Sequence, residues 1–204
     1  MLSSYKQLPL SILPVATKLA SPSQKTKKID FDDIALSVMT DLQQVSAITI
    51  AACDGIFDAE YKMKIRQVKL LFVVDHNEYI IGIVTYDELH GSYLQQIVDD
   101  TGIVASELCI LDVMIGVDSI QTLNLFDINE STVGDIIMTL NTLQKQHILV
   151  LEEKENIKVI RGLFSTSQIG KQLEINITEI FSQASKPDKD NPVNDNPVYE
   201  RFSA

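Results

Sequence analysis

Two short stretches of the sequence carry side chains that could bind a small ligand, and they share one layout. Each runs from a glycine through two apolar residues to a hydroxyl side chain, followed by carboxylates or an amide. The residues are Gly82, Thr85, Asp87 and Glu88 in "GIVTYDEL", and Gly162, Ser165 and Gln168 in "GLFSTSQI". Hydroxyl and amide groups donate or accept hydrogen bonds, and ionised carboxylates accept them. A repeat of this kind usually builds one shared site from two halves.

The two stretches recur because the chain contains two copies of a larger unit. Short β-branched runs alternate with helical apolar periodicity, which predicts strand, helix, strand, strand, helix in each copy. The elements are expected at residues 47–51, 58–68, 70–75, 79–85 and 86–98, and again at 122–125, 132–143, 147–152, 158–164 and 166–175. A matching lead-in precedes each copy, with Val38-Met39 aligned to Val113-Met114. The expected fold class is α/β, with two pseudo-symmetric subdomains.

Two of the predicted helices have details that a structure can test. The helix at 58–68 places Ala59, Met63, Ile65 and Val68 on an apolar stripe, with the last two one position off the ideal period. In the helix at 132–143, Thr132 and Asp135 have the spacing of a capping box.

Composition limits the function. The chain has 204 residues, 45% of them hydrophobic, and a formal net charge of −11. Such a chain can bury a core, whereas nonspecific binding to nucleic acid or anionic membranes needs a basic surface. The cysteines are isolated and the histidines stand far apart, so neither a metal site nor a disulfide framework is expected. A cytoplasmic protein without a membrane span is predicted.

The sequence motifs resemble those of a known family. The stretches "VMTDL", "LLFVVD" and "GIVTYDEL" resemble a cystathionine-β-synthase (CBS) domain, and "DVMIGV", "QKQHILVLE" and "GLFSTSQI" resemble a second one. The resemblance covers residues 34 to 175. Tandem CBS pairs are α/β modules that sense AMP, ADP, ATP or S-adenosylmethionine and commonly dimerise into flat discs. The resemblance thus implies a regulatory adenosine ligand and no required cofactor.

The resemblance also implies where the ribose would bind. In CBS modules similar to this one, an Asp that follows the Ser or Thr holds the ribose. Glu88 stands at this position in the first copy, with Asp87 one place earlier, and Gln168 replaces the acid in the second. At most one well-occupied adenosine site is expected, in the half with Glu88. The alternatives are N-capping, the main role expected for Thr85 and Ser165, and a solvated first-turn position for Glu88 and Gln168.

Basic residues just before the second strand of each CBS unit contact phosphates in the family. This makes Lys69 and His147 candidate phosphate contacts, and Arg161 is a third candidate donor. The alternatives are a surface lysine, a packed histidine and an arginine on the solvent face of its strand. The implied ligand-binding set is Lys69, Thr85, Asp87, Glu88, His147, Arg161, Ser165 and Gln168.

The function expected is a stand-alone regulatory module that binds its ligand between the subdomains and signals through an effector protein. The alternative is a ligand-independent dimerisation or protein-interaction module. No triad order, paired acids, metal cluster or phosphate loop is visible, so an enzyme is not expected.

Domain boundaries and self-association complete the predictions. An N-terminal arm is expected at 1–33, the CBS units at 34–103 and 104–180, and a disordered tail at 181–204. Partly uncovered apolar side chains on the helices at 86–98 and 166–175 predict a homodimer. These side chains are Leu89, Tyr93, Leu94, Ile169 and Leu173.

Overall fold

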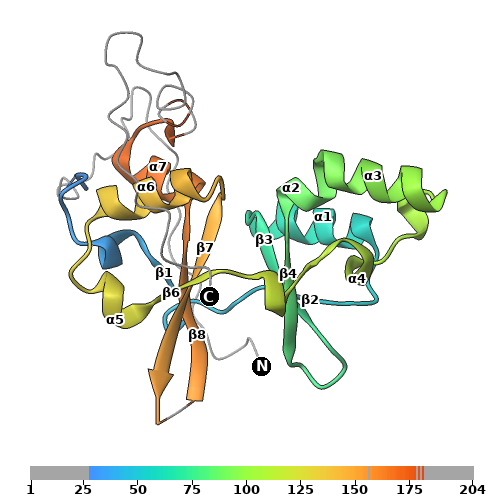
Figure 1. Ribbon diagram of the computed structural model, residues 1–204, viewed down its shortest axis with the longest axis horizontal. Helices are drawn as coiled ribbons and strands as arrows, with labels where there is room; N and C mark the ends of the chain where they lie inside the picture. The colour runs from blue at the N-terminus through green and yellow to red at the C-terminus, as the bar shows by residue number, and fades with distance from the viewer. Residues whose placement is uncertain (1–27, 156, 178, 180, 182–204) are drawn as a thin grey trace, which may run out of the picture.

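The computed structural model describes residues 28–155, 157–177, 179 and 181. Most of the predicted arm and nearly all of the predicted tail lie outside these residues. Within them the chain forms two units that stand side by side, each a four-stranded sheet covered by helices (Figure 1). The predicted α/β class with two pseudo-symmetric units is therefore confirmed.

The sheet of the first unit has the strand order β2-β3-β4-β5. Its strands are β2 (Thr49–Ala51), β3 (Leu70–Val74), β4 (Ile80–Thr85) and β5 (Ile115–Gly116). Strands β2 and β3 pair in parallel, whereas β3–β4 and β4–β5 are antiparallel.

The sheet of the second unit has the order β1-β8-β7-β6 and repeats this pattern. Its strands are β1 (Thr40–Asp41), β6 (Thr122–Asn124), β7 (His147–Lys154) and β8 (Ile157–Ser165). Strands β6 and β7 pair in parallel, and β7–β8 and β1–β8 are antiparallel.

The helices cover these sheets, and all but the short ones at 110–113 and 125–128 overlap segments that the apolar periodicity predicts as helical. They are α1 (Ile56–Arg66), α2 (Tyr86–His90), α3 (Ser92–Thr101), α4 (Ile110–Val113), α5 (Leu125–Ile128), α6 (Val133–Thr142) and α7 (Thr166–Leu173). Short 3-10 turns are η1 (Ala35–Val38), η2 (Ala105–Glu107) and η3 (Val117–Ser119). The predicted capping box of α6 is confirmed, since the Asp135 carboxylate accepts the Thr132 N–H at 2.8 Å.

The lead-ins are exchanged between the units. Strand β1 precedes the first unit in sequence but pairs with β8 of the second, and β5 precedes the second unit but pairs with β4 of the first. Val38 is accordingly buried in the core of the second unit, and Val113 in that of the first. The predicted boundaries 34–103 and 104–180 stay a prediction about the sequence repeat; in space, each lead-in packs with the other copy.

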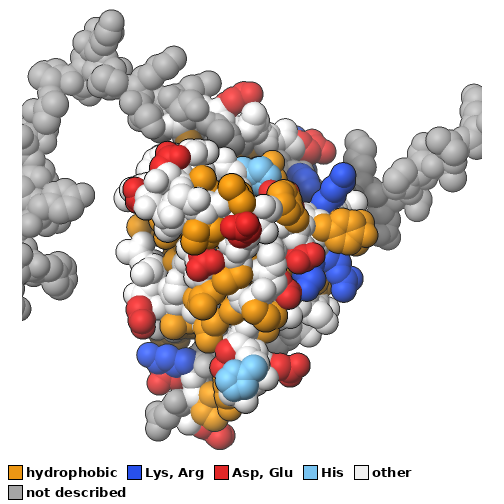
Figure 2. All heavy atoms as spheres, turned by 90° about the vertical axis from the view of Figure 1, so that its right-hand side faces the viewer, with side chains coloured by type: hydrophobic (Ala, Val, Ile, Leu, Met, Phe, Trp, Pro, Cys, Tyr) orange, Lys and Arg blue, Asp and Glu red, His pale blue; other side chains and the backbone are white. Residues whose placement is uncertain are grey.

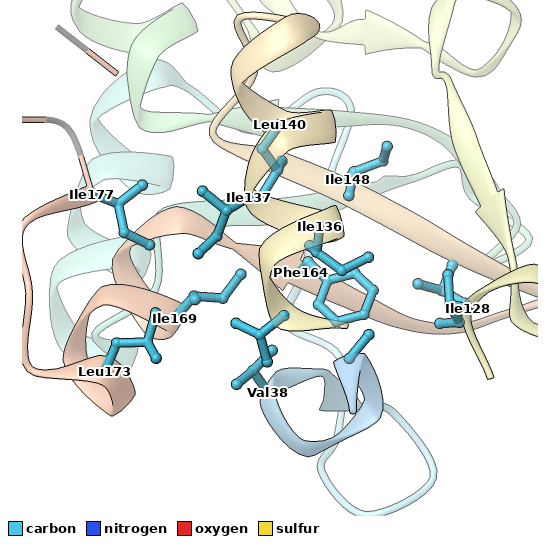
Figure 3. Close-up of a cluster of buried hydrophobic side chains, with 13 residues drawn as sticks. Val38, Ile128, Ile136, Ile137, Leu140, Ile148, Phe164, Ile169, Leu173 and Ile177 are labelled. Carbon is cyan, nitrogen blue, oxygen red and sulfur yellow. The ribbon is translucent and has the colours of Figure 1, made fainter. Parts of the chain in front are cut away.

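Each unit has its own apolar core, and a third cluster joins them. The core of the second unit gathers side chains from η1, α5, α6, α7, β7 and β8 around Phe164 (Figure 3). The joining cluster contains Leu70, Phe72 and Ile83 of the first sheet and Leu149 of the second. These side chains are buried where the two sheets meet, so this third cluster packs one unit against the other.

Two helix predictions need correction. Residues 86–98 form two helices, because Gly91 between α2 and α3 has an extended backbone. On α1, Ala59 and Met63 are buried as predicted, but Ile65 is 61% exposed. Ile65 lies two positions after Met63, which turns it to the opposite side of the helix.

The prediction that five apolar side chains on the helices at 86–98 and 166–175 form an exposed patch is largely wrong. Leu89, Ile169 and Leu173 are buried within the cores of their own units. Only Tyr93 and Leu94 of that set remain exposed or half-buried. The prediction failed because sequence periodicity identifies an apolar face but not which side of the helix the sheet already covers.

Every side chain of α3 is at least partly exposed. Figure 2 looks at the outer end of the first unit and shows hydrophobic side chains gathered across it, with acidic side chains among them. None of the described helices is long and apolar enough to span a membrane.

Candidate functional site

The two repeated stretches occupy equivalent strand-to-helix junctions. Thr85 ends β4 opposite Leu70 of β3, and Ser165 ends β8 opposite His147 of β7. At each junction, the first N–H of the following helix donates to the carbonyl before the neighbouring strand. These bonds are Tyr86 N to Lys69 O at 2.9 Å and Thr166 N to Gln146 O at 3.0 Å. Each hydroxyl is thus held beside the residues that precede the adjacent strand.

One cleft lies at the Thr85 junction and has a volume of about 240 Å³. We call it the Thr85 cleft. Its walls come from the β4–α2 junction, from β5 to η3 and its following residues, and from the α6–β7 connection. The polar lining residues are Thr85, Asp87, Glu88, Ser119, Gln121, Gln144, Lys145, Gln146 and His147. The first unit thus supplies the acids, and the second supplies the single lining lysine.

The second cleft lies at the Ser165 junction and has a volume of about 490 Å³. We call it the Ser165 cleft. Its apolar walls include Ile48, Phe72 and Leu163. Its polar lining residues are Thr40, Ser46, Arg66, Gln67, Lys69, His147, Ser165, Ser167, Gln168 and Lys171. Among the described residues, this lining contains cations but no Asp or Glu, so the cleft is electropositive within an acidic chain.

The Glu88 carboxylate caps its own helix. One of its oxygens accepts the Thr85 backbone N–H at 3.0 Å, and the Thr85 hydroxyl donates to the same oxygen. Capping was the alternative for Thr85, and a solvated first-turn position was the alternative for Glu88. In the structure the Glu88 carboxylate is bonded to Thr85 and closes the first turn of α2. The half that was predicted to hold the ribose has its carboxylate already engaged by the protein.

Replacing Glu88 with alanine should lower the free energy of unfolding by about 1 kcal/mol, because the bonds that close the first turn of α2 are lost. Urea unfolding measures this. Asp87→Ala is the matched control, since it removes a first-turn charge but not those bonds, and should cost only a few tenths of a kcal/mol. Equal losses in the two variants would contradict the capping role.

The Ser165 junction lacks the side-chain capping bonds that the Thr85 junction has. Ser165 occupies the N-cap position of α7, as predicted, but its side chain makes no capping bond to the helix. Its hydroxyl lies 2.9 Å from the Ser167 hydroxyl instead. Gln168 stands in place of an acid here, and no carboxylate of the described residues caps the start of α7. Uncapped N–H groups at a helix start favour an anion.

Lys69 reaches the Ser165 cleft from the unit opposite to Ser165. Its ammonium lies 5.9 Å from the centre of the Tyr86 ring, close enough for a weak cation–π contact. The Tyr86 ring in turn stacks on His90 at a centroid distance of 3.9 Å. The predicted phosphate contact Lys69 is thus placed together with Ser165 and Gln168, and not with Thr85 and Glu88.

His147 lines both clefts. Burial of the imidazole, together with the positive charge of Lys69, lowers the pKa of His147 to about 4. The side chain is therefore neutral at pH 7, and it can donate one N–H but cannot supply a positive charge. Of the alternatives weighed for this residue, a packed neutral histidine matches the structure.

The Arg161 guanidinium lies between two carboxylates of its own unit. Its guanidinium pairs with Asp41 of β1 and lies 3.3 Å from the Glu152 carboxylate of β7. Burial opposes ionisation of Asp41, but hydrogen bonds from the Gln43 backbone and from Arg161 outweigh it and lower the Asp41 pKa. Arg161 therefore fixes the exchanged strand β1 to the second sheet, and it lines neither the Thr85 cleft nor the Ser165 cleft. Its role as a phosphate donor stays a prediction.

Two cations of the Ser165 cleft were not predicted. Arg66 ends α1 and Lys171 lies on α7, one helical turn after Ser167. The spacing of Ser167, Gln168 and Lys171 on one helix face was the available signal for Lys171. Within the described residues, His, Cys, Asp and Glu side chains do not gather into groups of three or more that could hold a metal ion.

Comparison with known proteins gives the fold and no closer relation. The chain matches no protein-family model and no curated protein by sequence. A crystal structure of an uncharacterised conserved protein from Pyrococcus horikoshii is 18% identical, with a TM-score of 0.50, over 70% of this chain and 93% of that one. A CBS-domain-containing protein from Agrobacterium tumefaciens is 14% identical, with a TM-score of 0.50, over 74% of this chain and 98% of that one. CBSX2 in complex with AMP is 16% identical, with a TM-score of 0.46, over 68% and 94%.

The class that the fold defines is a two-unit α/β module with a ligand-sized cleft at each junction. More particularly, the chain has the fold of a tandem CBS-domain pair. The resemblance predicted from the motifs is confirmed at the level of fold.

Proposed function

We propose that this protein is a regulatory module that binds an anionic adenine nucleotide in the Ser165 cleft and signals through another protein. The observation that carries this proposal is the lining of that cleft by Arg66, Lys69 and Lys171. In a chain with a formal charge of −11, cations gathered in a cleft whose described lining contains no Asp or Glu favour an anionic ligand. Phosphate oxygens accept several charge-assisted bonds at once from such groups.

The rest of the cleft suits the other parts of a nucleotide. Its volume of about 490 Å³ lies in the range of small-molecule sites. Ile48, Phe72 and Leu163 offer an apolar slot for a planar base, and Gln168 offers an amide to the ribose hydroxyls. S-adenosylmethionine carries a sulfonium cation, which Arg66, Lys69 and Lys171 would repel. AMP, ADP and ATP are therefore the favoured ligands.

Binding would couple to the arrangement of the two units. Arg66 and Lys69 come from the first unit, and Gln168 and Lys171 from the second. A ligand that contacts both sides binds some relative poses of the units better than others, and it shifts the population toward them. An effector protein that recognises one pose would receive this signal.

Titration calorimetry with AMP, ADP, ATP and S-adenosylmethionine tests the proposal. We expect heat of binding for the nucleotides and at least about tenfold weaker binding of S-adenosylmethionine. Arg66→Gln and Lys171→Gln should each weaken nucleotide binding roughly 10- to 100-fold, the effect of a lost charge-assisted hydrogen bond.

Lys145→Gln is the matched control, because Lys145 lines the Thr85 cleft and not the Ser165 cleft. It should leave the affinity unchanged. If Lys145→Gln weakens binding and Lys171→Gln does not, the ligand occupies the Thr85 cleft. Absence of heat with every adenine compound would favour the ligand-independent interaction module.

A further inference from the structure

A groove lies at the outer end of the first unit, apart from both clefts. It is formed by α2, α3 and the segment that follows α3, and it has a volume of about 480 Å³. Its apolar lining residues are Leu89, Leu94, Val98, Val104 and Ala105. Among the described residues, no side chain that lines this groove also lines the Thr85 cleft or the Ser165 cleft. We call it the α3 groove.

Large apolar side chains are exposed in and beside the groove. Val104 is 53% exposed, Tyr93 49% and Ile103 40%. Leu94 and Val98 lie four residues apart and so form one row along α3. Apolar side chains that gather on a surface and remain in contact with water mark a place where another molecule binds.

Acidic side chains from three elements border the groove. On α3, the Asp99 carboxylate accepts a hydrogen bond at 2.8 Å from the amide of Gln95, which lines the groove. On α1, the Glu60 carboxylate lies 3.3 Å from the imidazole of His90, another lining residue. Glu107 is exposed on η2, shortly after the lining residues of that segment. The groove is thus apolar inside and acidic around its border.

The sequence around the groove offers no cation to balance these acids. Residues 70–144, which include α2, α3 and η2, contain no Lys or Arg. The cations of the first unit stand earlier, at Lys62, Lys64, Arg66 and Lys69, and none of them lines the groove. Figure 2 shows acidic side chains among the hydrophobic ones on this face, with Lys and Arg toward the edges of the view. Such a face attracts a basic partner and repels nucleic acid, an anionic membrane or a second copy of itself.

We propose that the α3 groove binds a basic amphipathic helix of another protein. An apolar groove that follows a helix receives the apolar face of a partner helix. Leucine-like side chains of the partner would lie between Leu94 and Val104. Its lysines or arginines would pair with Asp99, Glu60 and Glu107. This inference names the chemistry of the effector and in that respect rests on the proposed function, but docking itself needs no nucleotide.

The chain's own N-terminal segment is a poorer occupant of the groove. Residues 1–28 contain Lys but no Asp or Glu, so their charge would suit it. Pro9 and Pro14 interrupt their apolar run, however, and proline does not suit the interior of a helix. This segment also joins the described chain at the second unit, where the Lys28 ammonium lies 3.3 Å from the Glu174 carboxylate. A helix of another protein is therefore the occupant that these observations favour.

Fluorescence anisotropy with two labelled peptides, each about 18 residues or five helical turns long, tests the proposal. Both peptides carry leucine on one helix face, and the other positions are lysine in one peptide and glutamate in the second. The full chain should bind the lysine peptide with a dissociation constant on the order of 10 μM in about 0.1 M salt, and more weakly as salt rises. The glutamate peptide should not bind.

A pair of charge-reversed variants locates the binding site. Asp99→Lys together with Asp100→Lys should weaken binding of the lysine peptide at least about tenfold. Both residues lie in the last turn of α3, where lysine suits the helix dipole, so the fold should keep its stability. Asp127→Lys together with Glu130→Lys is the matched control, because it makes the same change in net charge on the exposed surface of the second unit. It should leave the affinity within about twofold, since distant charges are screened.

A second pair of variants tests the apolar part of the contact. Val104→Ser should weaken binding of the lysine peptide about fivefold, because an apolar side chain in the groove is lost. Phe126→Ser is the matched control, since Phe126 is 83% exposed on α5 of the second unit and lies outside the groove. It should leave the affinity unchanged.

Several results would overturn the proposal. The two peptides could bind equally well, or neither could bind. The two charge-reversed variants could weaken binding to the same extent, which would make the attraction nonspecific. An unlabelled peptide of residues 1–27 could bind more tightly than the lysine peptide and displace it, which would make the chain's own segment the occupant.

Sedimentation velocity of the chain alone covers the remaining occupant. If the chain associates with itself and Val104→Ser abolishes that association, the groove binds a second copy and the proposal is wrong. None of these results bears on nucleotide binding, because the described residues of the Ser165 cleft are separate from those of the α3 groove. Titration calorimetry tests that function separately.

Discussion

Replacing Gly82 or Gly162 with alanine is expected to destabilise the fold by about 3 kcal/mol, toward the upper end for an overpacked site. A Cβ on Gly82 would lie 2.5 Å from the Ile115 carbonyl oxygen, and one on Gly162 would lie 2.6 Å from the Thr40 carbonyl oxygen. Both obstacles are backbone atoms of the exchanged strands, so the strand pairs themselves must separate. Urea unfolding measures the loss.

Gly116→Ala is the matched control for this prediction. Gly116 pairs directly with Gly82 across β4 and β5, yet a Cβ at this position would meet nothing within 4 Å. It should change the free energy of unfolding by less than about half a kcal/mol. If the Gly82 and Gly162 variants are as stable as the Gly116 variant, the exchanged strands do not lie as close to the junctions as described.

This packing explains why both stretches begin with glycine. A Cβ added to Gly82 would lie 2.9 Å from the Met114 sulfur, and one added to Gly162 would lie 2.9 Å from the Met39 sulfur. The aligned Val-Met pairs of the lead-ins thus have one role in both units: the valine fills the core, and the methionine covers the glycine. The glycines are required by close packing, whether or not a ligand binds.

The order and type of the main elements could be predicted because each strand and helix has its own local pattern. The exchange of lead-ins could not, because β1 and β5 are two residues long and nothing local identifies their pairing partners. The orientation of Ile65 was missed for a related reason. The outer side of α1 also carries large apolar residues, namely Phe57, Tyr61 and Ile65. The sequence therefore shows apolar residues on both sides of this helix and does not indicate which side the sheet covers.

The candidate site was predicted in part. The repeat correctly led to two junctions, and Lys69 and His147 do lie beside them. Which cleft is cationic depends on residues from both units, such as Arg66 and Lys171, which are distant in sequence. Glu88 bonds to Thr85, and Arg161 pairs with Asp41. Residue types alone do not predict either of these pairings.

The protein should lose stability on acidification because of His147. In the unfolded chain the imidazole has its ordinary pKa of about 6.5, whereas burial first, and then the charge of Lys69, lowers the pKa to about 4 in the fold. Above pH 6.5 the imidazole is neutral in both states and costs nothing. Between pH 6.5 and 4 only the unfolded chain takes up the proton, which destabilises the fold by about 3 kcal/mol in total.

Urea unfolding of the wild type and of His147→Gln at pH 7.5 and pH 4.5 measures this contribution. Carboxylates also titrate in this range, so the difference between the two proteins, and not either slope alone, isolates His147. His76→Gln is the control for the substitution itself, since it removes an exposed histidine on the β3–β4 turn. Lys69→Gln should reduce the loss only in part, because burial is the larger cause. If His147→Gln loses as much stability as the wild type, the imidazole is solvated, and the wall between the two clefts is more open than described.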